Sequence, residues 1–351
     1  MESKHILDVT IIGGGPAGLF AAFYGGLREM SVKIIEFQPY LGGKVHVYPE
    51  KMIWDVGGLM PTTGAKLIEQ LEAQARTFNP EIVLGEKVVS LSQDETGIFT
   101  LHTASGQEHY SRTIIIAVGG GILKPTKLNI EGAERFEVSN LHYTVKSLAR
   151  FKNKTVLISG GGNAAIDWAN ELEPIAKQVY LTYRSDMLKG HEAEVTKLQN
   201  GSTKLLLNTT IETLIADNDH SAIQKVLLRK NEDESVIELE VDDVIINHGY
   251  ERDMALLKES VLKIELKDDY WVNGSVLSES SVPGIFAAGD ILHHDGKLHL
   301  IAGAFQDAAN AINKAKLYIA PDARAWGMVS SHNELFQKKN KELMKHLYKN
   351  A

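Results

Sequence analysis

The chain has 351 residues, of which 44% are hydrophobic and 23% are charged, and its formal net charge is −8 at pH 7. This composition is typical of a globular protein large enough for two domains, and the negative balance argues against general nucleic-acid binding. Cysteine is absent, which excludes disulfides, thiolate metal sites, cysteine-ligated iron–sulfur clusters and a redox-active cysteine pair.

The sequence gives no sign of a targeting or membrane segment. No apolar run approaches the roughly 18 residues that a membrane span needs. The first residues, MESKHILDV, lack the apolar stretch of a signal peptide. We therefore expect a cytoplasmic protein without a membrane span.

A first glycine-rich loop follows the first expected strand. Residues 6–12 have the pattern of a buried parallel strand, residues 17–27 that of a helix packed on it, and Gly13, Gly15 and Gly18 between them form GxGxxG. In such a loop the first glycine allows a tight turn, the second lets a diphosphate approach the backbone, and the third lets helix and strand pack closely.

A carboxylate stands at the expected distance from this loop. Residues 31–37 form a second strand, and Glu36 lies 18 positions after Gly18, where it can accept both hydroxyls of an adenosine ribose. The alternative is a structural turn followed by a surface glutamate. The strand, loop, helix and acid together favour a dinucleotide site.

Further segments suggest that this dinucleotide is a flavin. Residues 41–51 follow the Glu36 strand as a glycine-containing loop, and residues 282–291 form a short strand that ends in Gly-Asp, so that Asp290 can bind a ribityl or ribose hydroxyl. The strands at 113–121 and 242–250 both end in glycine, as expected where a chain crosses between two domains. An NAD site needs none of these additions, whereas a flavin dinucleotide would use several.

A second loop of the same kind lies near the middle of the chain. Gly160, Gly162 and Ala165 form GxGxxA between an expected strand at 155–158 and a helix at 165–173. Two such loops suggest one flavin that stays bound and one nicotinamide that exchanges.

The residues after the second loop indicate which nicotinamide binds. The position 18 residues after Ala165 is Tyr183, and Arg184 follows it, with Lys189 further on. A carboxylate there would repel a 2′-phosphate, whereas a guanidinium can bind it with two hydrogen bonds. The sequence therefore favours NADPH over NADH, although Arg184 as a solvated loop residue is the alternative.

The C-terminal part ends in a basic segment. Residues 307–319 have a helical pattern, and the extension beyond carries Lys338, Lys339, Lys341, Lys345 and Lys349. This segment is either a docking site for an acidic protein or an ordinary solvated helix. His293, His294 and His299 lack the spacing of a metal site and are expected to be loop residues.

The ordered motifs resemble those of two-dinucleotide-binding-domain flavoproteins. GxGxxG, Glu36, AVGGG, GxGxxA and AAGD occur in the order seen in the low-molecular-weight branch, which includes thioredoxin reductase. FYGGLR, VYPEK, EPIAK, expected to be helical, and LHLIAGAF are similar to segments of the thioredoxin-reductase-like ferredoxin–NAD(P)+ reductases. The resemblance covers about residues 9–331.

The resemblance implies a set of FAD contacts. Glu36 would bind the adenosine ribose, Val88 the adenine, Asp290 the ribityl chain, and Tyr48 would stack on the isoalloxazine. Leu123 and Ser331 complete the set, and Lys44 stands where the family usually carries glutamine. Tyr48 as an ordinary loop aromatic is the alternative. A cap over the other flavin face would come from the C-terminal extension, often from the partner subunit of a homodimer, at Val329 or His332.

The resemblance also implies the architecture and the reaction. We expect an α/β protein with two Rossmann-like domains, the nicotinamide domain (119–248) being inserted into a discontinuous FAD domain (1–118 and 249–325), followed by an extension (326–351). Hydride would pass from NADPH to flavin N5, and electrons would leave singly to ferredoxin or flavodoxin, so that no catalytic acid or base is needed. The alternatives are an NAD(P)H dehydrogenase for quinones or ferric complexes, and a flavoprotein with a structural or sensory FAD.

Overall fold

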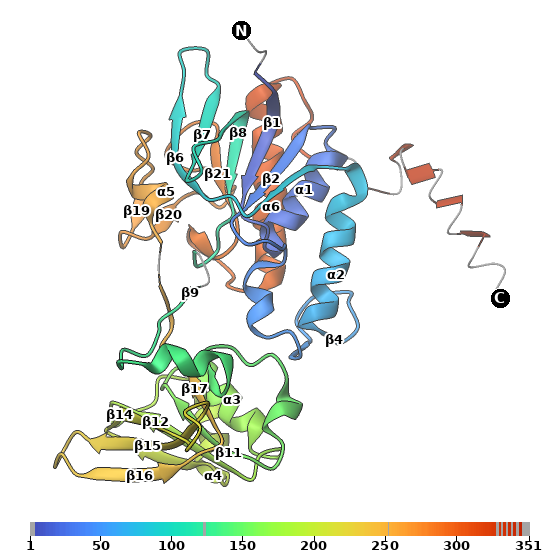
Figure 1. Ribbon diagram of the computed structural model, residues 1–351. Coiled ribbons are helices and arrows are strands. Elements are labelled where there is room, and N and C mark those ends of the chain that lie inside the picture. Colours follow the sequence, from blue (N-terminus) through green and yellow to red (C-terminus); the bar gives the residue numbers. More distant parts are fainter. Residues whose placement is uncertain are drawn as a thin grey trace. The chain divides into compact units, whose positions relative to one another are not determined.

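The computed structural model describes residues 4–121, 124–251 and 253–327, and residues 330, 333, 334, 336, 337, 340, 341, 344 and 345. By the density of its internal contacts the chain divides into two compact units (Figure 1). Unit 1 contains Met1–His46, Lys51–Ile122 and Arg252–Ala351, and unit 2 contains Val47–Glu50 and Leu123–Glu251.

Unit 1 is built on a sheet of seven strands in its described part, with the order β5-β2-β1-β8-β7-β6 and with β21 paired to β8. The pairs among β5, β2, β1, β8 and β21 are parallel, whereas β6 and β7 pair antiparallel (Figure 1). The strands are β1 (Ile6–Ile12), β2 (Val32–Glu36), β5 (Glu81–Leu84), β6 (Val88–Gln93), β7 (Phe99–Thr103), β8 (Glu108–Ile116) and β21 (Ile285–Ala287).

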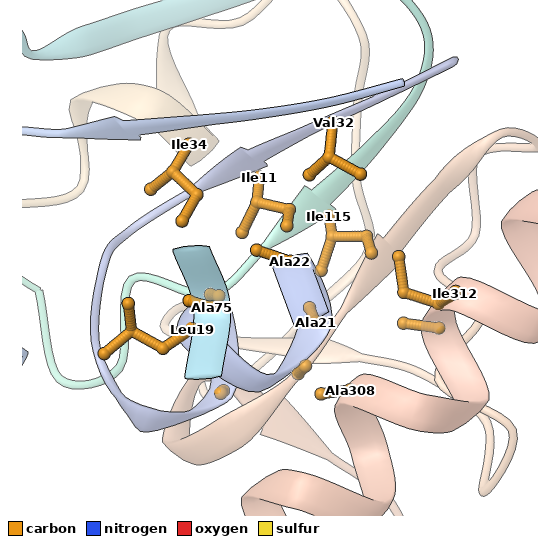
Figure 2. Packing of buried hydrophobic residues seen from close by; sticks show 14 of the residues in the cluster. Ile11, Leu19, Ala21, Ala22, Val32, Ile34, Ala75, Ile115, Ala308 and Ile312 are labelled. Atoms are coloured by element: carbon orange, nitrogen blue, oxygen red, sulfur yellow. The ribbon is translucent and has the colours of Figure 1, made fainter. Parts of the chain in front are cut away.

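Helices cover one face of this sheet. Ile11 lies opposite Ile34 on β2 and Ile115 on β8, and Figure 2 shows Ile11 and Ile115 beside Ala22 of α1. Ala308 of α6 belongs to the same cluster. The small helix residues allow close approach, and burial of each isoleucine contributes about 1.5–3 kcal/mol. The helices of unit 1 are α1 (Pro16–Leu27), α2 (Gly64–Ala75), α5 (Ala255–Lys258) and α6 (Ile301–Ile319).

The other face of the sheet is covered too, which explains why its central strands are almost wholly apolar. Ile12, Ile35 and Ile116 pack there with Leu91 of β6 and Leu101 of β7. The remaining short elements of unit 1 are η1 (Gly43–Val47), β3 (Met52–Ile53), β4 (Thr62–Thr63), η2 (Arg76–Phe78), β19 (Leu266–Lys267), β20 (Trp271–Asn273), η5 (Gly289–Ile291) and β22 (Leu292–His293).

Helix α6 is longer than the sequence pattern suggested. It begins at Ile301, six residues before the expected start at position 307. Gly303 explains the difference, because a Cβ at this position would collide with the carbonyl oxygen of Leu298. The glycine that weakens the helical pattern therefore permits the first turn to pack on the preceding loop.

Unit 2 has its own parallel sheet, with the order β10-β17-β11-β12-β13. One face packs against α3, where Ala165 and Ile166 are buried with Val156 and Ile158 of the sheet. The elements of this layer are β10 (Leu141–His142), β11 (Thr155–Ser159), α3 (Asn163–Leu172), β12 (Gln178–Tyr183), α4 (Glu192–Asn200), β13 (Lys204–Leu207) and β17 (Asp243–Ile246).

The opposite face of the unit 2 sheet is covered by an antiparallel sheet. Val226 and Leu228 of β15 are buried there with Leu157 and Val244. The remaining elements of unit 2 are β9 (Lys124–Pro125), η3 (Ala133–Val138), η4 (Leu148–Phe151), β14 (Thr209–Ala216), β15 (Ile223–Lys230), β16 (Val236–Glu240) and β18 (Tyr250–Glu251).

The expected helix at EPIAK is wrong. Helix α3 ends at Leu172, and residues 173–177 form turns. Pro174 explains this, because it has no N–H to donate to the carbonyl oxygen of Asn170, although Glu173 before it still has helical φ and ψ.

A mixed sheet with a parallel centre in unit 1 and a parallel sheet in unit 2, which is inserted within unit 1, confirm the α/β class with Rossmann-like units. In the part of the chain that the structure describes, no helix has the length and apolar character needed to cross a membrane.

Candidate dinucleotide-binding sites

The first glycine loop lies at the carboxyl end of β1, and backbone packing alone leaves no room for a side chain at two of its glycines. Gly13 has a φ of +109°, and a Cβ there would lie 2.5 Å from the carbonyl oxygen of Ala117, while a Cβ on Gly18 would collide with the carbonyl oxygen of Gly13. Gly15 differs, because the nearest atom to an added Cβ would be 3.8 Å away, on Gly43. The backbone at Gly15 is therefore open to a ligand.

The start of α1 suits an anion. Its first-turn residues, Pro-Ala-Gly-Leu, carry no negative charge, and Gly15 occupies the N-cap without a side chain. The free N–H groups and the helix dipole favour a phosphate group at such a helix end.

Glu36 is fixed beside this loop. Its Oε2 accepts a hydrogen bond of 2.6 Å from the N–H of Gly14, and its Oε1 accepts one of 2.8 Å from the N–H of Gln38. The side chain is buried at the end of β2. Each carboxylate oxygen keeps a second lone pair for a ligand hydroxyl.

The segment that precedes Val88 lies beside Glu36. The N–H of Glu86 donates to the carbonyl oxygen of Glu36 over 3.1 Å, and the N–H of Gly85 donates to that of Gln38 over 3.1 Å. Val88 itself begins β6 and is buried. The fold thus brings the expected adenine and ribose contacts to one corner of unit 1.

Asp290 lies on the other side of the first loop. It is half-buried in η5, which follows β21 at the same carboxyl edge of the sheet. Gly289 has a φ of +79°, and a Cβ there would lie 3.1 Å from the Cβ of Ala17 in the first turn of α1. Asp290, β1 and α1 therefore share one site.

The loop after Glu36 packs against the first glycine loop. The N–H of Gly42 donates to the carbonyl oxygen of Gly14 over 2.8 Å. Gly43 has a φ of +56°, and a Cβ built on it would lie 2.8 Å from the Cα of Gly15. Lys44 follows and is exposed.

Tyr48 is half-buried in residues 47–50, which group with unit 2. There, Oε2 of Glu50 accepts a hydrogen bond of 2.8 Å from the N–H of Leu148. Tyr48 is therefore carried by a segment assigned to a different unit from Glu36 and Asp290. Leu123, Ser331, Val329 and His332 lie outside the described residues.

The second loop repeats the geometry in unit 2. Gly160 follows β11, and a Cβ there would lie 2.6 Å from the carbonyl oxygen of Asn247 and 3.0 Å from the Cβ of Ala165. Ala165 is fully buried. Gly162 forms the N-cap of α3, and nothing lies within 4 Å of a Cβ built on it. Its open position matches that of Gly15.

Arg184 and Lys189 flank this loop. Arg184 follows Tyr183 at the end of β12, and its carbonyl oxygen accepts a 2.9 Å hydrogen bond from Asn231 Nδ2. The N–H of Lys189 donates to the carbonyl oxygen of Gly161 over 2.7 Å, so its backbone lines the loop. Both cationic side chains are exposed.

Sequence reasoning missed His248, which follows β17 at the same edge. Its Nε2 lies 2.9 Å from the hydroxyl of Ser159, the last residue of β11. Removal of water by the surrounding protein lowers the pKa of His248, and the positive charge of Arg184 lowers it further. The imidazole is therefore neutral near pH 7. The strand-plus-glycine signal at 242–250 marked this edge but gave no role to the histidine.

The histidines near Asp290 have structural contacts. His294 Nδ1 lies 2.8 Å from the carbonyl oxygen of Asp295, and the ring of His293 lies 6.5 Å from that of Trp271. Within the described ranges, no group of three or more metal-ligating side chains comes together.

Arg324 and the C-terminal extension that follows it contact the end of α1 that is remote from the first loop. Arg28 Nη2 donates to the carbonyl oxygen of Arg324 over 2.6 Å, and the ring of Phe336 packs edge-on against that of Phe78 at 5.5 Å. Of the tail lysines, Lys341 and Lys345 are exposed, and Lys338, Lys339 and Lys349 lie outside the described residues.

The two loops thus have similar backbone geometry but lie beside side chains of opposite charge. The first places a buried carboxylate next to an open glycine and a helix N-terminus, and the second places exposed cations there. This arrangement can hold two different dinucleotides.

The chain is similar to several known proteins. A family model described as pyridine nucleotide-disulphide oxidoreductase matches residues 7–315. A ferredoxin–NADP reductase 1 from Bacillus thuringiensis (strain Al Hakam) is 64% identical over 349 residues, with 99% of this chain and 100% of the relative covered. The protein of the same name from Bacillus cytotoxicus is 66% identical over 347 residues, with 99% of each covered.

A solved structure shares the fold. The thioredoxin reductase of Lactococcus lactis superposes with a TM-score of 0.74 at 24% identity, covering 90% of this chain and 99% of its own. The family match and the Bacillus relatives confirm the resemblance drawn from the motifs, and this structure confirms the fold.

Proposed function

The chain belongs to the pyridine nucleotide-disulphide oxidoreductase family, and on that basis we propose that it is a flavin-dependent ferredoxin–NADP+ reductase. The observation that carries the proposal is the pair of loops, one with Glu36 fixed beside it and one flanked by Arg184. FAD and NADPH are the two cofactors of such reductases.

The first loop fits FAD. We assign its binding to the open backbone of the loop, to the fixed carboxylate of Glu36, and to the Asp290 turn. The FAD-contacting residues of this proposal are Gly13, Gly15, Gly18, Glu36, Lys44, Tyr48, Val88, Leu123, Asp290 and Ser331. When bound, FAD accepts a hydride from NADPH and releases electrons one at a time. The protein supplies binding and orientation, so no acid or base is assigned.

The second loop fits NADPH. The space at Gly162 and the start of α3 would receive the diphosphate, and Arg184 would bind the 2′-phosphate. The residues of this proposal are Gly160, Gly162, Ala165, Arg184 and Lys189. We place the NADPH domain at 119–248, between the parts of an FAD domain at 1–118 and 249–325, and the division of internal contacts supports this insertion.

The electron acceptor must approach the flavin itself, because the chain has no cysteine that could relay electrons. We propose ferredoxin or flavodoxin as this acceptor, in keeping with the name of the Bacillus relatives. The exposed Lys341 and Lys345 support a basic docking surface for an acidic partner. We further propose that the protein works in the cytoplasm.

A homodimer is the assembly that we propose. Helix α1 has 12 residues and is about 18 Å long at 1.5 Å per residue. The tail contacts at Arg28 and Phe78 lie near its far end. These contacts place the start of the extension far from the first loop of its own subunit. This supports a role of the extension in covering the flavin of a second subunit.

Stopped-flow absorption tests the proposed function. NADPH should bleach the bound flavin, and purified ferredoxin or flavodoxin should restore its colour faster than a quinone does. A protein whose flavin is reoxidised only by the quinone would instead be a small-acceptor dehydrogenase.

Glu36→Gln should weaken FAD binding about tenfold or more, because loss of one charge-assisted hydrogen bond costs about 1.5–3 kcal/mol. Glu81→Gln, elsewhere on the same sheet, is the control.

A further inference from the structure

A buried ion pair lies directly behind the Asp290 turn. Asp307 of α6 and Lys297 of the preceding loop form this pair, and their side chains are 6% and 4% exposed. The same Asp307 oxygen, Oδ2, also accepts a 3.0 Å hydrogen bond from the N–H of Gly289. One carboxylate thus connects α6, the loop before it and the turn that carries Asp290.

Further contacts keep Asp307 in place. Its carbonyl oxygen accepts a 2.9 Å hydrogen bond from the hydroxyl of Ser278, a fully buried residue. On the other side, Nε2 of His294 lies 3.7 Å from Oδ1 of Asp307. The carboxylate is thus held by Gly289, Lys297 and His294, and the backbone of Asp307 is held by Ser278.

A buried ion pair is a costly way to hold a helix. Removal of two charges from water opposes folding, and apolar residues of similar volume often serve stability equally well. The chain nevertheless places the pair at a turn whose backbone is already constrained, since Gly289 has a φ of +79° and packs against Ala17. A function beyond stability would explain this placement.

We propose that Asp307, oriented by Lys297, is a positioning residue that fixes the Gly289–Asp290 turn for the flavin; this rests on the proposed function, in which Asp290 contacts the ribityl chain. The hydrogen bond to the N–H of Gly289 fixes the peptide group that precedes Asp290. An ionised acceptor forms a shorter and stronger hydrogen bond than a neutral one, and Lys297 compensates its charge where water is excluded.

Two double variants without buried charge separate this role from a purely structural one. Lys297→Met with Asp307→Asn removes both charges but keeps an amide oxygen that can accept from Gly289. Lys297→Met with Asp307→Leu removes the acceptor as well. Apoprotein of each is titrated with FAD, and the dissociation constant, the visible spectrum of the bound flavin and the thermal unfolding midpoint of the apoprotein are measured.

The Asn variant should bind FAD within about threefold of the wild type, because the acceptor is retained. The Leu variant should bind at least about tenfold more weakly, or about 1.4 kcal/mol, with a shifted flavin spectrum. The two apoproteins should unfold at similar temperatures. Lys33→Met with Glu81→Gln removes the ion pair of another buried lysine of unit 1 with an exposed glutamate and should leave FAD binding unchanged.

Equal FAD affinity and identical spectra for the Asn and Leu variants would overturn the inference. If the Leu variant does not fold, Lys297→Met with Asp307→Ala replaces it in the same comparison, since alanine lacks the acceptor and adds no bulk. Wild-type apoprotein that takes up no FAD would overturn the proposed function and this inference together. If the wild type binds FAD and the Asn and Leu variants bind it equally well, only the inference is overturned.

Discussion

Glu36 and Arg184 show how one side chain distinguishes two similar loops. Glu36 is the last residue of its strand and is buried with its oxygens directed by two backbone N–H groups, whereas Arg184 follows its strand and is exposed. A fixed carboxylate suits ribose hydroxyls, whereas an exposed guanidinium can bind a phosphate. The contrast supports different ligands for the two loops.

Arg184→Ala should therefore affect one nicotinamide only. Loss of a charge-assisted phosphate contact costs about 1.5–3 kcal/mol, so the KM for NADPH should rise about tenfold or more while the KM for NADH changes little. Steady-state kinetics with both nucleotides measure this. Arg135→Ala removes a charge elsewhere in unit 2 and controls for net charge. Equal effects of Arg184→Ala on both nucleotides would assign the 2′-phosphate to another residue.

Asp243 is a buried charge with a structural function. Burial by itself would raise the pKa of Asp243, but hydrogen bonds of 2.7 Å from His142 and 2.7 Å from Lys154 hold it below its ordinary value. A depressed pKa contributes stability that is present above the unfolded value of about 3.9 and is lost as the pH falls through the folded value.

Asp243→Asn should lower the free energy of unfolding at pH 7 by about 1.5–3 kcal/mol, because hydrogen bonds to a charged group are lost. The difference from the wild type should shrink as the pH falls below about 3.9, where the unfolded carboxylate is protonated. Urea unfolding at several pH values measures it. A difference that stays constant down to the acid limit would show that the charge of Asp243 is not its source.

At the scale of the element, each loop joins a strand to the N-terminus of a helix, and its glycines have different tasks. Gly13, Gly18 and Gly160 face backbone so closely that a Cβ must collide, so they are needed for folding. Gly162 has extended backbone and open space where a Cβ would stand. A substitution there tests the ligand and not the fold.

Gly162→Ala should leave the unfolding midpoint and FAD content nearly unchanged, because alanine adopts this backbone without collision. Binding of NADPH should weaken, because the methyl group occupies space that the diphosphate needs. Calorimetric titration with NADP+ and thermal unfolding together make the comparison. Gly160→Ala is the contrasting variant and should destabilise the apoprotein. Unchanged nucleotide binding in Gly162→Ala would place the diphosphate elsewhere.

At the scale of the whole molecule, we propose that the extension governs access to the flavin. Its contacts with Arg28 and Phe78 direct it away from the first loop of its own subunit. We expect a dimer in which each tail covers the partner's flavin and presents lysines to an acidic electron acceptor.

Truncation after Arg324 should shift the flavin spectrum and alter the oxidation rate by small acceptors. Lys→Gln changes at 338, 339 and 341 should lower only the rate with ferredoxin. In the intact protein that rate should fall with salt, because exposed charges are screened within about 8–10 Å at 0.1–0.15 M ionic strength. Light scattering gives the mass of each form. A truncated protein with unchanged spectrum, dye reduction and ferredoxin rate would remove the tail from the mechanism.

The sequence by itself determined the features that depend on neighbouring residues. Each strand, glycine turn and helix lies within a short segment, so Gly13–Gly18 and Gly160–Ala165 could be recognised from spacing alone. The opposite charges of the side chains that follow the two loops were also visible in the sequence, at Glu36 and Arg184. The ordered motifs were specific enough to predict the family and the inserted architecture.

Only the tertiary structure decided which distant residues meet. The Lys297–Asp307 pair on Gly289, the cations around Asp243 and the contact between His248 and Ser159 join side chains that no local pattern relates. Helix α6 begins earlier than its pattern because Gly303 packs on a neighbouring loop. Periodicity reports which face of an element is buried, but the charge that a buried polar group meets depends on how separate elements pack.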